Sequence, residues 1–557
     1  HLPSIYHMSS CSEAEHNVGT EASAGEVALS GGLDVDTLAT ATDVVDVVEG
    51  EVKLADSTVR LGTAPLGPLL FWLCFPTAIS MSINALYNLA DSYFVGKYAG
   101  TEGLTALSLA TPLEALFATA VAIAIGVGGG AFMSVLLGKG QLSAGRMLMA
   151  HILSLGLVAA LVISAVMLPS IEWWLVTVLG CSDAVLPTAL AYSRVIFVFA
   201  PFGYFMVTGL LPLLRCENRA PVAMMMQILA SLVNVIGDPI FMGLFDLGIA
   251  GAAYSTSFSQ WAIGACVLFF YLRPKSTSDI SPNFKGMFTG GFDISLIQRV
   301  LSGGIGQYAS MLPPTLCTIV ANIQLAAYAP TSSEGDTYVA AMGLALRFQS
   351  LLFMPMIGLC LGLQPVLGYN YGKKNFTRMR RATVRVLYAA FIFTIVCTTF
   401  MEIFPSQLAG AFSDDDEVVR VATTMTRVTF AACWLQAATQ VANVITQVYH
   451  NVGINILVTL GRPVFMITLE FLLPLVRGIN GVWEAFFIAD SLTGLLSLGV
   501  CVYYLRRMGR SALEDQKGEE EEGEGDSVDA VERGQEPDTH SHSHSMSVSD
   551  AEDSRDV

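Results

Sequence analysis

Long apolar segments of about 20 residues or more recur along the middle of this 557-residue chain. Each is long enough to cross a bilayer core about 30 Å thick as an α-helix. Charged residues make up only 14% of the chain and hydrophobic residues 53%, whereas about 25% of a soluble globular protein is charged. Because unpaired backbone polar groups are costly in lipid, this pattern predicts an all-α integral membrane protein with many spans.

Two acidic tails flank twelve predicted spans. Residues 1–60 carry a net charge of −9 and residues 509–557 one of −12, so the overall charge of −18 belongs to the tails. Neither tail has enough apolar side chains to form a core, and we expect disorder over 1–62 and 508–557. The predicted spans cover residues 67–95, 104–137, 147–169, 191–214, 221–245, 249–272, 300–329, 339–371, 386–404, 418–449, 455–477 and 482–505.

Basic residues predict how the spans are oriented. The loops GKGQLSAGR, RCENRA and GKKNFTRMRRATVR fall on one side of the membrane, together with a short loop that ends at Arg462 and the segment RRMGR after the last span. Loops on the opposite side, such as TSSEGDT and SDDDE, are acidic. We therefore expect both termini in the cytosol, which agrees with an even number of spans.

The two halves of the chain repeat each other. One constant offset along the sequence aligns Gly128 with Gly362, Gly138 with Gly372, Lys139 with Lys373, and Arg146 with Arg380. A slightly shorter offset aligns GIAGAA at 248–253 with GINGVW at 478–483. Six spans in each half, in the same orientation, predict two pseudo-symmetric lobes that flank a central site, as in secondary transporters. The predicted units are an N-lobe over 63–272, a cytosolic linker over 273–299 and a C-lobe over 300–507.

A single carboxylate interrupts the apolar run 221–245, at Asp238 in NVIGDPIFMG. A charge within a span costs about 2.5–3.5 kcal/mol on insertion scales and indicates a function. Asn234 lies one helical turn earlier on the same face, and Pro239 leaves a backbone carbonyl without its usual donor. These oxygen atoms suit a small cation or a proton. The alternative is that Asp238 caps a helix that restarts at Pro239.

Two further oxygen-bearing side chains are expected at the same depth. At 1.5 Å per residue, Asp238 and Thr256 lie about 10 Å from the outer ends of their spans, and Asp91 about 8 Å. Two nearby carboxylates compete for ionisation, so such a pair takes up a proton or is held ionised by a cation. We predict a cation-coupling site at Asp91, Asn234, Asp238 and Thr256, which binds H⁺ or Na⁺ with Pro239 as its hinge.

Amide side chains replace the acids in the second half. Within 418–449 they recur at steps of 4, 3 and 4, which places them on one helix face. They line an uncharged wall of a substrate cavity, or they form hydrogen bonds between helices. The amide candidates for the substrate cavity are Gln307, Asn322, Gln436, Gln440, Asn443 and Gln447.

Two glutamates inside spans complete the candidate set. Glu114 lies early in the second span, where it can face the cavity, and Glu470 lies deep in the eleventh, where it can attract a cationic substrate. The alternative is an ion pair with an arginine such as Arg347 or Arg462. The ten cysteines show no spacing typical of metal ligands, which favours small buried apolar residues.

Three stretches resemble the MATE (multidrug and toxic compound extrusion) family: NALYNLADSYFVG, NVIGDPIFMGLFDLGIAGAAYST and FMPMIGLCLGLQPVLGYNYGKKNFTRMRRA. The resemblance covers about residues 67–507 and is strongest to the prokaryote-type multidrug branch. It implies twelve helices in two six-helix lobes around a central cavity. It also implies export of organic cations and other amphipathic compounds in exchange for H⁺ or Na⁺.

The resemblance also implies roles for individual residues. The family's N-lobe cation site corresponds here to Asp91, Asn234, Asp238 and Thr256. Some branches instead use acids in helices seven and ten, which this sequence lacks, so the resemblance implies ion coupling in the N-lobe. The implied partners are small organic substrates and the lipid bilayer, with no nucleic acid and no cofactor besides the coupling ion, and we expect a monomer.

Two other functions fit the sequence less well. A lipid-headgroup flippase of the same superfamily would favour a more basic cavity than the sequence provides. A membrane-embedded enzyme is disfavoured because the chain has no HExxH, no GxSxG and no paired intramembrane histidines. The leading hypothesis is therefore a secondary antiporter that works by alternating access of its two lobes.

Overall fold

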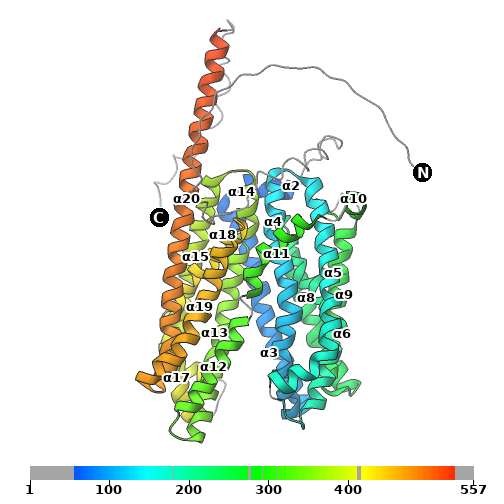
Figure 1. Ribbon diagram of the computed structural model, residues 1–557, viewed down its shortest axis with the longest axis vertical. Helices are drawn as coiled ribbons and strands as arrows, with labels where there is room; N and C mark the ends of the chain where they lie inside the picture. The colour runs from blue at the N-terminus through cyan, green and yellow to red at the C-terminus, as the bar shows by residue number, and fades with distance from the viewer. Residues whose placement is uncertain are drawn as a thin grey trace, which may run out of the picture.

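The computed structural model describes residues 56–179, 181–273, 278–290, 293–309, 312–410 and 416–532, which form helices and short connections without a strand. Figure 1 shows the helices of the two halves as two bundles side by side, blue through cyan to blue-green for the first and green through yellow to red-orange for the second. The first half contains α3 (Leu66–Leu113), η2 (Glu114–Thr119), α4 (Ala120–Lys139), α5 (Leu142–Trp173), η3 (Trp174–Val178), α6 (Leu186–Tyr204), η4 (Phe205–Gly209), α7 (Leu211–Cys216), α8 (Ala220–Asp238), η5 (Pro239–Leu244) and α9 (Gly248–Leu272).

The second half follows a connecting helix, α10 (Phe284–Gly290). It contains α11 (Ile294–Ala309), α12 (Leu312–Tyr328), α13 (Ser332–Leu361), α14 (Gln364–Gly372), α15 (Phe376–Ile403), α16 (Pro405–Gly410), α17 (Asp416–Phe430), η6 (Cys433–Leu435), α18 (Gln436–Val448), α19 (Val452–Arg477) and α20 (Asn480–Glu532). Across the two halves, elements η2 to η5 are π-helical turns and η6 is a 3₁₀ turn.

Ten of the described helices are long and apolar enough to cross a membrane, and α17 with η6 and α18 forms an eleventh span that is bent by 43°. The predicted span at 300–329 falls on α11 and α12, each of which is too short to cross alone. The described helices therefore account for eleven of the twelve predicted spans, and α11 and α12 lie where the twelfth was predicted. The first two spans are continuous in α3, which kinks at Gly100, where φ is 66°. Glycine adopts that conformation without steric cost.

Glycines allow the two lobes to approach closely where the repeat predicted equivalent positions. α4 of the N-lobe packs against α11 and α14 of the C-lobe, and α3 of the N-lobe packs against α13 of the C-lobe. A Cβ atom on Gly138 would lie 2.0 Å from the carbonyl oxygen of Tyr369, and one on Gly372 would lie 2.2 Å from that of Val135. The repeat-related glycines therefore face each other across one contact between the lobes, which we call the glycine seam (Gly138, Gly372 and their neighbours).

A short helix that precedes the spans is anchored to the linker between the lobes. In α2 (Asp56–Thr63), Leu61 is fully buried and the Thr58 hydroxyl donates a hydrogen bond to Asp279 at 2.7 Å. The prediction of a disordered tail is therefore wrong over 56–62, because a few apolar and polar contacts with the lobes suffice to hold this turn. Residues 1–55 lie outside the described part of the chain.

The last helix continues beyond the predicted boundary of the C-lobe. α20 extends to Glu532, whereas disorder was predicted from residue 508. The prediction rested on the lack of apolar residues, but glutamate has a favourable helix propensity, and a helix that already spans the membrane avoids the cost of nucleation. Residues 533–557 lie outside the described part of the chain.

Glu217 fastens the same linker to the N-lobe at the ends of α7 and α8. Its side chain is 1% exposed, and its Oε1 atom accepts hydrogen bonds from the Ser278 hydroxyl at 2.6 Å and from the backbone N–H of Asp279 at 2.7 Å. Arg219 lies 3.9 Å from the other carboxylate oxygen. Burial raises the pKa of Glu217 to about 7.

Glu217→Gln is expected to weaken the pH dependence of thermal stability. Since burial raises the pKa of this carboxyl from 4.5 to about 7, the folded protein binds the proton more tightly than the unfolded chain. That stabilisation is complete below the pKa of Glu217 in the unfolded chain and is lost as the pH rises through its pKa in the folded protein. The loss is about 3 kcal/mol, at about 1.4 kcal/mol per pKa unit. Thermal unfolding across this pH range measures it. If the wild type and the variant lost the same thermal stability as the pH rises, Glu217 would not be the group responsible.

Candidate functional site

The predicted coupling residues of α8 and α9 lie together in the N-lobe. Asp238, the last residue of α8, is fully buried, and neither of its carboxylate oxygens has a hydrogen-bond partner among the described residues. Asn234, one turn earlier, donates to the Thr256 hydroxyl of α9 at 3.1 Å, while its own amide oxygen is unpartnered in this part of the chain. The Ser255 hydroxyl, which lies beside Asp238, donates instead to the Asn234 backbone carbonyl at 2.8 Å.

Asp91 of α3 completes the predicted set. It is half-buried, and one of its carboxylate oxygens is buried without a partner in the described structure. Asp91 is close enough to Asp238 and to Glu114 for its carboxylate to be repelled by each of them when they are ionised. The structure thus brings together four residues that the sequence placed at one depth, and adds Glu114 to them. We call this group the N-lobe acidic cluster (Asp91, Asn234, Asp238, Thr256 and Glu114).

Tyrosines bind Glu114, where sequence analysis considered an arginine. The glutamate begins η2 and accepts hydrogen bonds from the hydroxyl of Tyr192 at 3.0 Å and from that of Tyr204, both on α6. Tyr87, one turn before Asp91, also interacts with the acidic cluster. These tyrosines were missed by sequence analysis, although Tyr192 and Tyr204 each interrupt an apolar run with a hydroxyl that a buried partner must satisfy.

Departures from regular α-helix geometry gather at the acidic cluster. Glu114 begins one π-helical turn, Asp238 precedes another, and Tyr204 precedes a third. Pro239 opens the turn after Asp238, as expected for a residue that lacks a backbone donor. Because π-helical turns are frequent at functional sites, this geometry agrees with the predicted hinge at Pro239, which stays a prediction.

The oxygen atoms of the cluster fit a small hard cation or a proton. Asp238 and Asn234 present oxygens that no described donor satisfies, and Thr256 adds a hydroxyl oxygen. Such a donor set suits Na⁺, while two close carboxylates suit a shared proton. Within the described residues, no group of three or more His, Cys, Asp or Glu side chains is arranged for a metal ion. A multivalent metal site is therefore not indicated in this part of the chain.

Several of the C-lobe amides are used for hydrogen bonds between helices. Gln436 donates to Asp490 at 2.7 Å, Asn443 accepts from Thr459 at 3.0 Å, and Gln447 is 3.5 Å from Gln307. These contacts agree with the alternative of interhelical bonding. Two candidates are half-buried and stay predictions for a cavity wall: Gln440 and Asn322.

A half-buried ion pair in the C-lobe was not predicted. Arg462 lies within α19, ten residues after its start, and its Nε atom is 2.5 Å from Asp490 of α20. The sequence-based placement of Arg462 in a cytosolic loop is therefore wrong. The sequence contained a signal of this error, because the loop that was predicted to end at Arg462 overlaps the predicted span 455–477. Glu470, further along α19, is fully buried with both oxygens unpartnered in the described structure. The side chain of Arg347 lies outside the described part.

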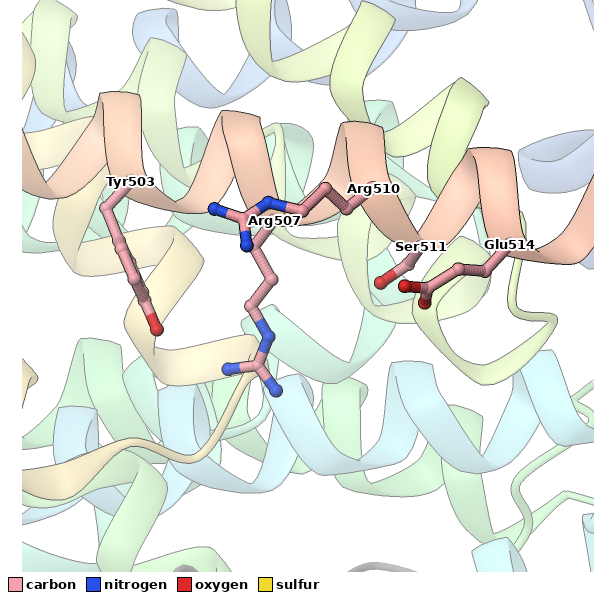
Figure 2. Close-up of a pocket in the computed structure, with 5 residues that line it drawn as sticks. All are labelled: Tyr503, Arg507, Arg510, Ser511 and Glu514. Carbon is pink, nitrogen blue, oxygen red and sulfur yellow. The ribbon is translucent and has the colours of Figure 1, made fainter.

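Two surface pockets lie in different parts of the molecule. One is lined by Tyr503, Arg507, Arg510, Ser511 and Glu514, which Figure 2 shows projecting from the middle of α20. This pocket contains none of the predicted site residues. The second, between α3 and α8, is almost wholly apolar and is lined by Ile83, Leu86, Tyr87, Ala90, Ile228, Ser231, Leu232 and Val235. Through Tyr87, this α3/α8 pocket adjoins the acidic cluster.

Comparison with known families and curated proteins gives a consistent result. The family model described as MatE matches residues 76–240 and 295–472, one segment in each lobe. The multidrug export protein MepA of Staphylococcus aureus is 25% identical over 445 residues, which cover 80% of this chain and 95% of that protein. MepA of Staphylococcus saprophyticus is 24% identical over 433 residues, which cover 77% and 92%.

Solved structures show the same twelve-helix, two-lobe fold. An outward-facing structure of a multidrug resistance MATE family transporter of the MOP superfamily aligns with a TM-score of 0.76 at 21% identity, over 82% of this chain and all of that one. A MOP superfamily transporter from Pyrococcus furiosus aligns with a TM-score of 0.75 at 22% identity over the same shares. At these identities the likeness shows the fold alone.

Proposed function

Because the chain belongs to the MATE family, we propose that it is a secondary antiporter that exports organic cations or amphipathic drug-like compounds in exchange for H⁺ or Na⁺. The curated relatives are multidrug export proteins by name. Export by this chain would use alternating access of its two lobes about the central site. No residue arrangement among those described suggests catalysis, and the family consists of transporters.

The observation that carries the proposal is the buried carboxylate of Asp238. Both of its oxygens lack a donor in the described structure, and the side chain has no exposure. A buried, unpaired carboxylate is strongly unfavourable, so it requires a proton or a bound cation. Asn234 and Thr256 supply the neighbouring oxygens that such an ion needs. The N-lobe acidic cluster therefore has the chemistry of an ion-coupling site.

Coupling follows if the ion and the substrate prefer different states of the N-lobe. An ion shifts a conformational equilibrium only by its differential affinity for the two states. Binding from outside neutralises Asp238 and Asp91, and so removes the negative charge that attracts an organic cation. The substrate then leaves, the lobes rock, and the ion is released on the cytosolic side.

The α3/α8 pocket is our candidate for the apolar part of the substrate. Its lining is nearly free of polar surface, and Tyr87 connects it to the carboxylates. An apolar pocket beside negative charge suits amphipathic cations of varied shape. A flippase for anionic headgroups would favour a basic cavity, whereas Arg462, a half-buried arginine of a C-lobe span, is already neutralised by Asp490.

The orientation of the protein is part of the proposal. The basic loops of the chain lie on the side of the glycine seam, where α4 ends at Lys139 and α14 ends at Gly372. By the positive-inside rule this side faces the cytosol, and both termini are there. Protease protection of epitopes at the two termini in sealed vesicles tests this orientation.

Transport in liposomes tests the proposed function. The purified protein is reconstituted with a fluorescent organic cation inside, and efflux is followed with only a pH gradient and then with only a Na⁺ gradient. We expect one of the two gradients to drive efflux, which identifies the coupling ion. Efflux that responds to neither gradient would overturn the proposal of cation-coupled antiport.

A further inference from the structure

The C-lobe contains a second buried carboxylate at the position that the repeat pairs with Asp238. The separation of Asp238 and Glu470 along the sequence lies between the two sequence offsets that align other parts of the two halves. Both residues lie on the fifth span of their lobe. Asp238 is six residues from the end of its span at Leu244, and Glu470 is seven residues from the end of its span at Arg477. Their depths in the membrane are therefore nearly equal.

The side chain of Glu470 is buried without a donor. Its exposed fraction is 0%, and neither carboxylate oxygen has a hydrogen-bond partner among the described residues. The nearby cation is Arg462 on the same helix, but its Nε atom already binds Asp490 at 2.5 Å. Gln436 donates to the same aspartate at 2.7 Å. Arg462 and Asp490 thus form a neutral pair, which leaves the charge of an ionised Glu470 uncompensated.

The other helices packed against α19 add no cation to Glu470 in the described part of the chain. Cys317 of α12 interacts with Glu470 as well as with the Arg462–Asp490 pair. Cys433, in the turn before α18, and Asp490 of α20 act on Arg462 rather than on Glu470. None of the described charged groups of α11 acts on Glu470. Among the described titratable groups, those that act on Glu470 are therefore the shared guanidinium of Arg462 and the thiol of Cys317.

These surroundings select a proton rather than a metal ion. Met466, one turn before Glu470, and Cys317 belong to the buried apolar cluster of the C-lobe. Sodium and other hard cations require several oxygen ligands, which the Cys317 thiol, the Met466 thioether and the Arg462 guanidinium do not provide. A proton needs only the carboxylate and leaves a neutral group that the apolar surroundings tolerate.

We propose that Glu470 is a second proton-binding site, located in the C-lobe and equivalent by pseudo-symmetry to Asp238. Its part in transport rests on the proposed cation-coupled antiport, whereas proton binding at Glu470 does not. When Glu470 loses its proton, its carboxylate competes with Asp490 for Arg462, whose Nη2 atom has no partner in the described structure. Because the Arg462–Asp490 pair joins α19 to α20, protonation of Glu470 is linked to the packing of these two helices.

Infrared difference spectroscopy of the full-length protein in lipid nanodiscs tests the site. A buried protonated carboxyl group gives a C=O stretching band that disappears as the pH is raised. We expect Glu470→Gln to remove one such band and Glu470→Asp to retain it at a shifted frequency. The matched control is Glu484→Gln, which changes an acid of α20 that pairs with Arg477 at the protein surface, and we expect it to leave the band unchanged.

The outcomes separate this proposal from the proposed function. A Glu470→Gln spectrum identical to that of the wild type overturns the second site, even if a cation gradient drives efflux in liposomes. Loss of the band supports the site, even if neither gradient drives efflux and the antiport proposal fails. If Glu470→Gln does not fold, the comparison uses Glu470→Asp, and a band that does not shift overturns the proposal.

Discussion

Asp238→Asn is expected to reduce gradient-driven efflux of an organic cation by about 100-fold, close to the leak from liposomes without protein. The reason is that a charge-assisted interaction contributes about 3 kcal/mol. The amide is nearly the same size as the carboxylate, so the packing at the end of α8 is retained. It cannot take up a proton or offer a full negative charge to Na⁺. Efflux rates with the gradient that drives the wild type, and again with no gradient, measure the effect.

Asp246→Asn is the matched control for this substitution. Asp246 lies eight residues further along, is exposed, and has a φ of 53°. Asparagine tolerates this left-handed conformation well, so the same chemical change is made at a site where neither burial nor ion binding is involved. We expect efflux close to that of the wild type. An Asp238→Asn variant as active as this control would indicate that Asp238 is a helix cap, and the proposed coupling site would be wrong.

The grouping of the candidate coupling residues was predictable because a few features determine it. A carboxylate in an apolar run is costly wherever the helices pack, so Asp238 marks a site before any contact is known. Depth along three spans then places Asp91 and Thr256 near it, since helix rise is constant. In the structure these residues lie near one another. Which ion binds them depends on distances and hydration that a linear pattern does not contain.

Contacts between helices were less predictable than depth. The tyrosines on Glu114 and the pair of Arg462 with Asp490 depend on which faces of two spans meet. Helical periodicity gives the face that each residue shares with its neighbours, but the rotation of one helix against another is set by packing over its whole length. Sequence analysis therefore offered Arg462 as a partner for glutamates, whereas the structure pairs it with Asp490. Charge balance alone does not distinguish these pairings.

The boundaries of the elements differed from prediction where the chain bends without changing its composition. α3 passes from the first span to the second through a kink at Gly100, and α17 meets α18 at 43° near Cys433. An apolar run shows that a segment lies in the membrane, but it contains little information about a bend inside it. Kinks arise from glycine, proline and π-helical turns, and of these only the proline at 239 was used in the prediction.

Gly138→Ala is expected to open the glycine seam on the cytosolic side and to lower efflux by about 10-fold, which corresponds to about 1.4 kcal/mol. The added Cβ atom would lie 2.0 Å from the carbonyl oxygen of Tyr369, and backbone atoms cannot move aside as a flexible side chain does. Overpacking of this kind costs about 1–3 kcal/mol. The cost falls only on the state in which α4 and α14 touch, so the equilibrium between the two states of the lobes shifts toward the one open to the cytosol.

Alkylation of Cys74 measures this shift directly. Cys74 is 7% exposed on α3, and Gly362 of the C-lobe packs against its backbone. In a variant that retains only this cysteine, a membrane-impermeant maleimide added to the cytosolic side should react faster once Gly138→Ala is introduced. The control is Gly499→Ala on α20, where a Cβ atom would meet nothing within 4 Å. If Gly138→Ala lowers efflux without faster alkylation, the seam does not control access, and the pseudo-symmetric glycines serve only to pack the two lobes.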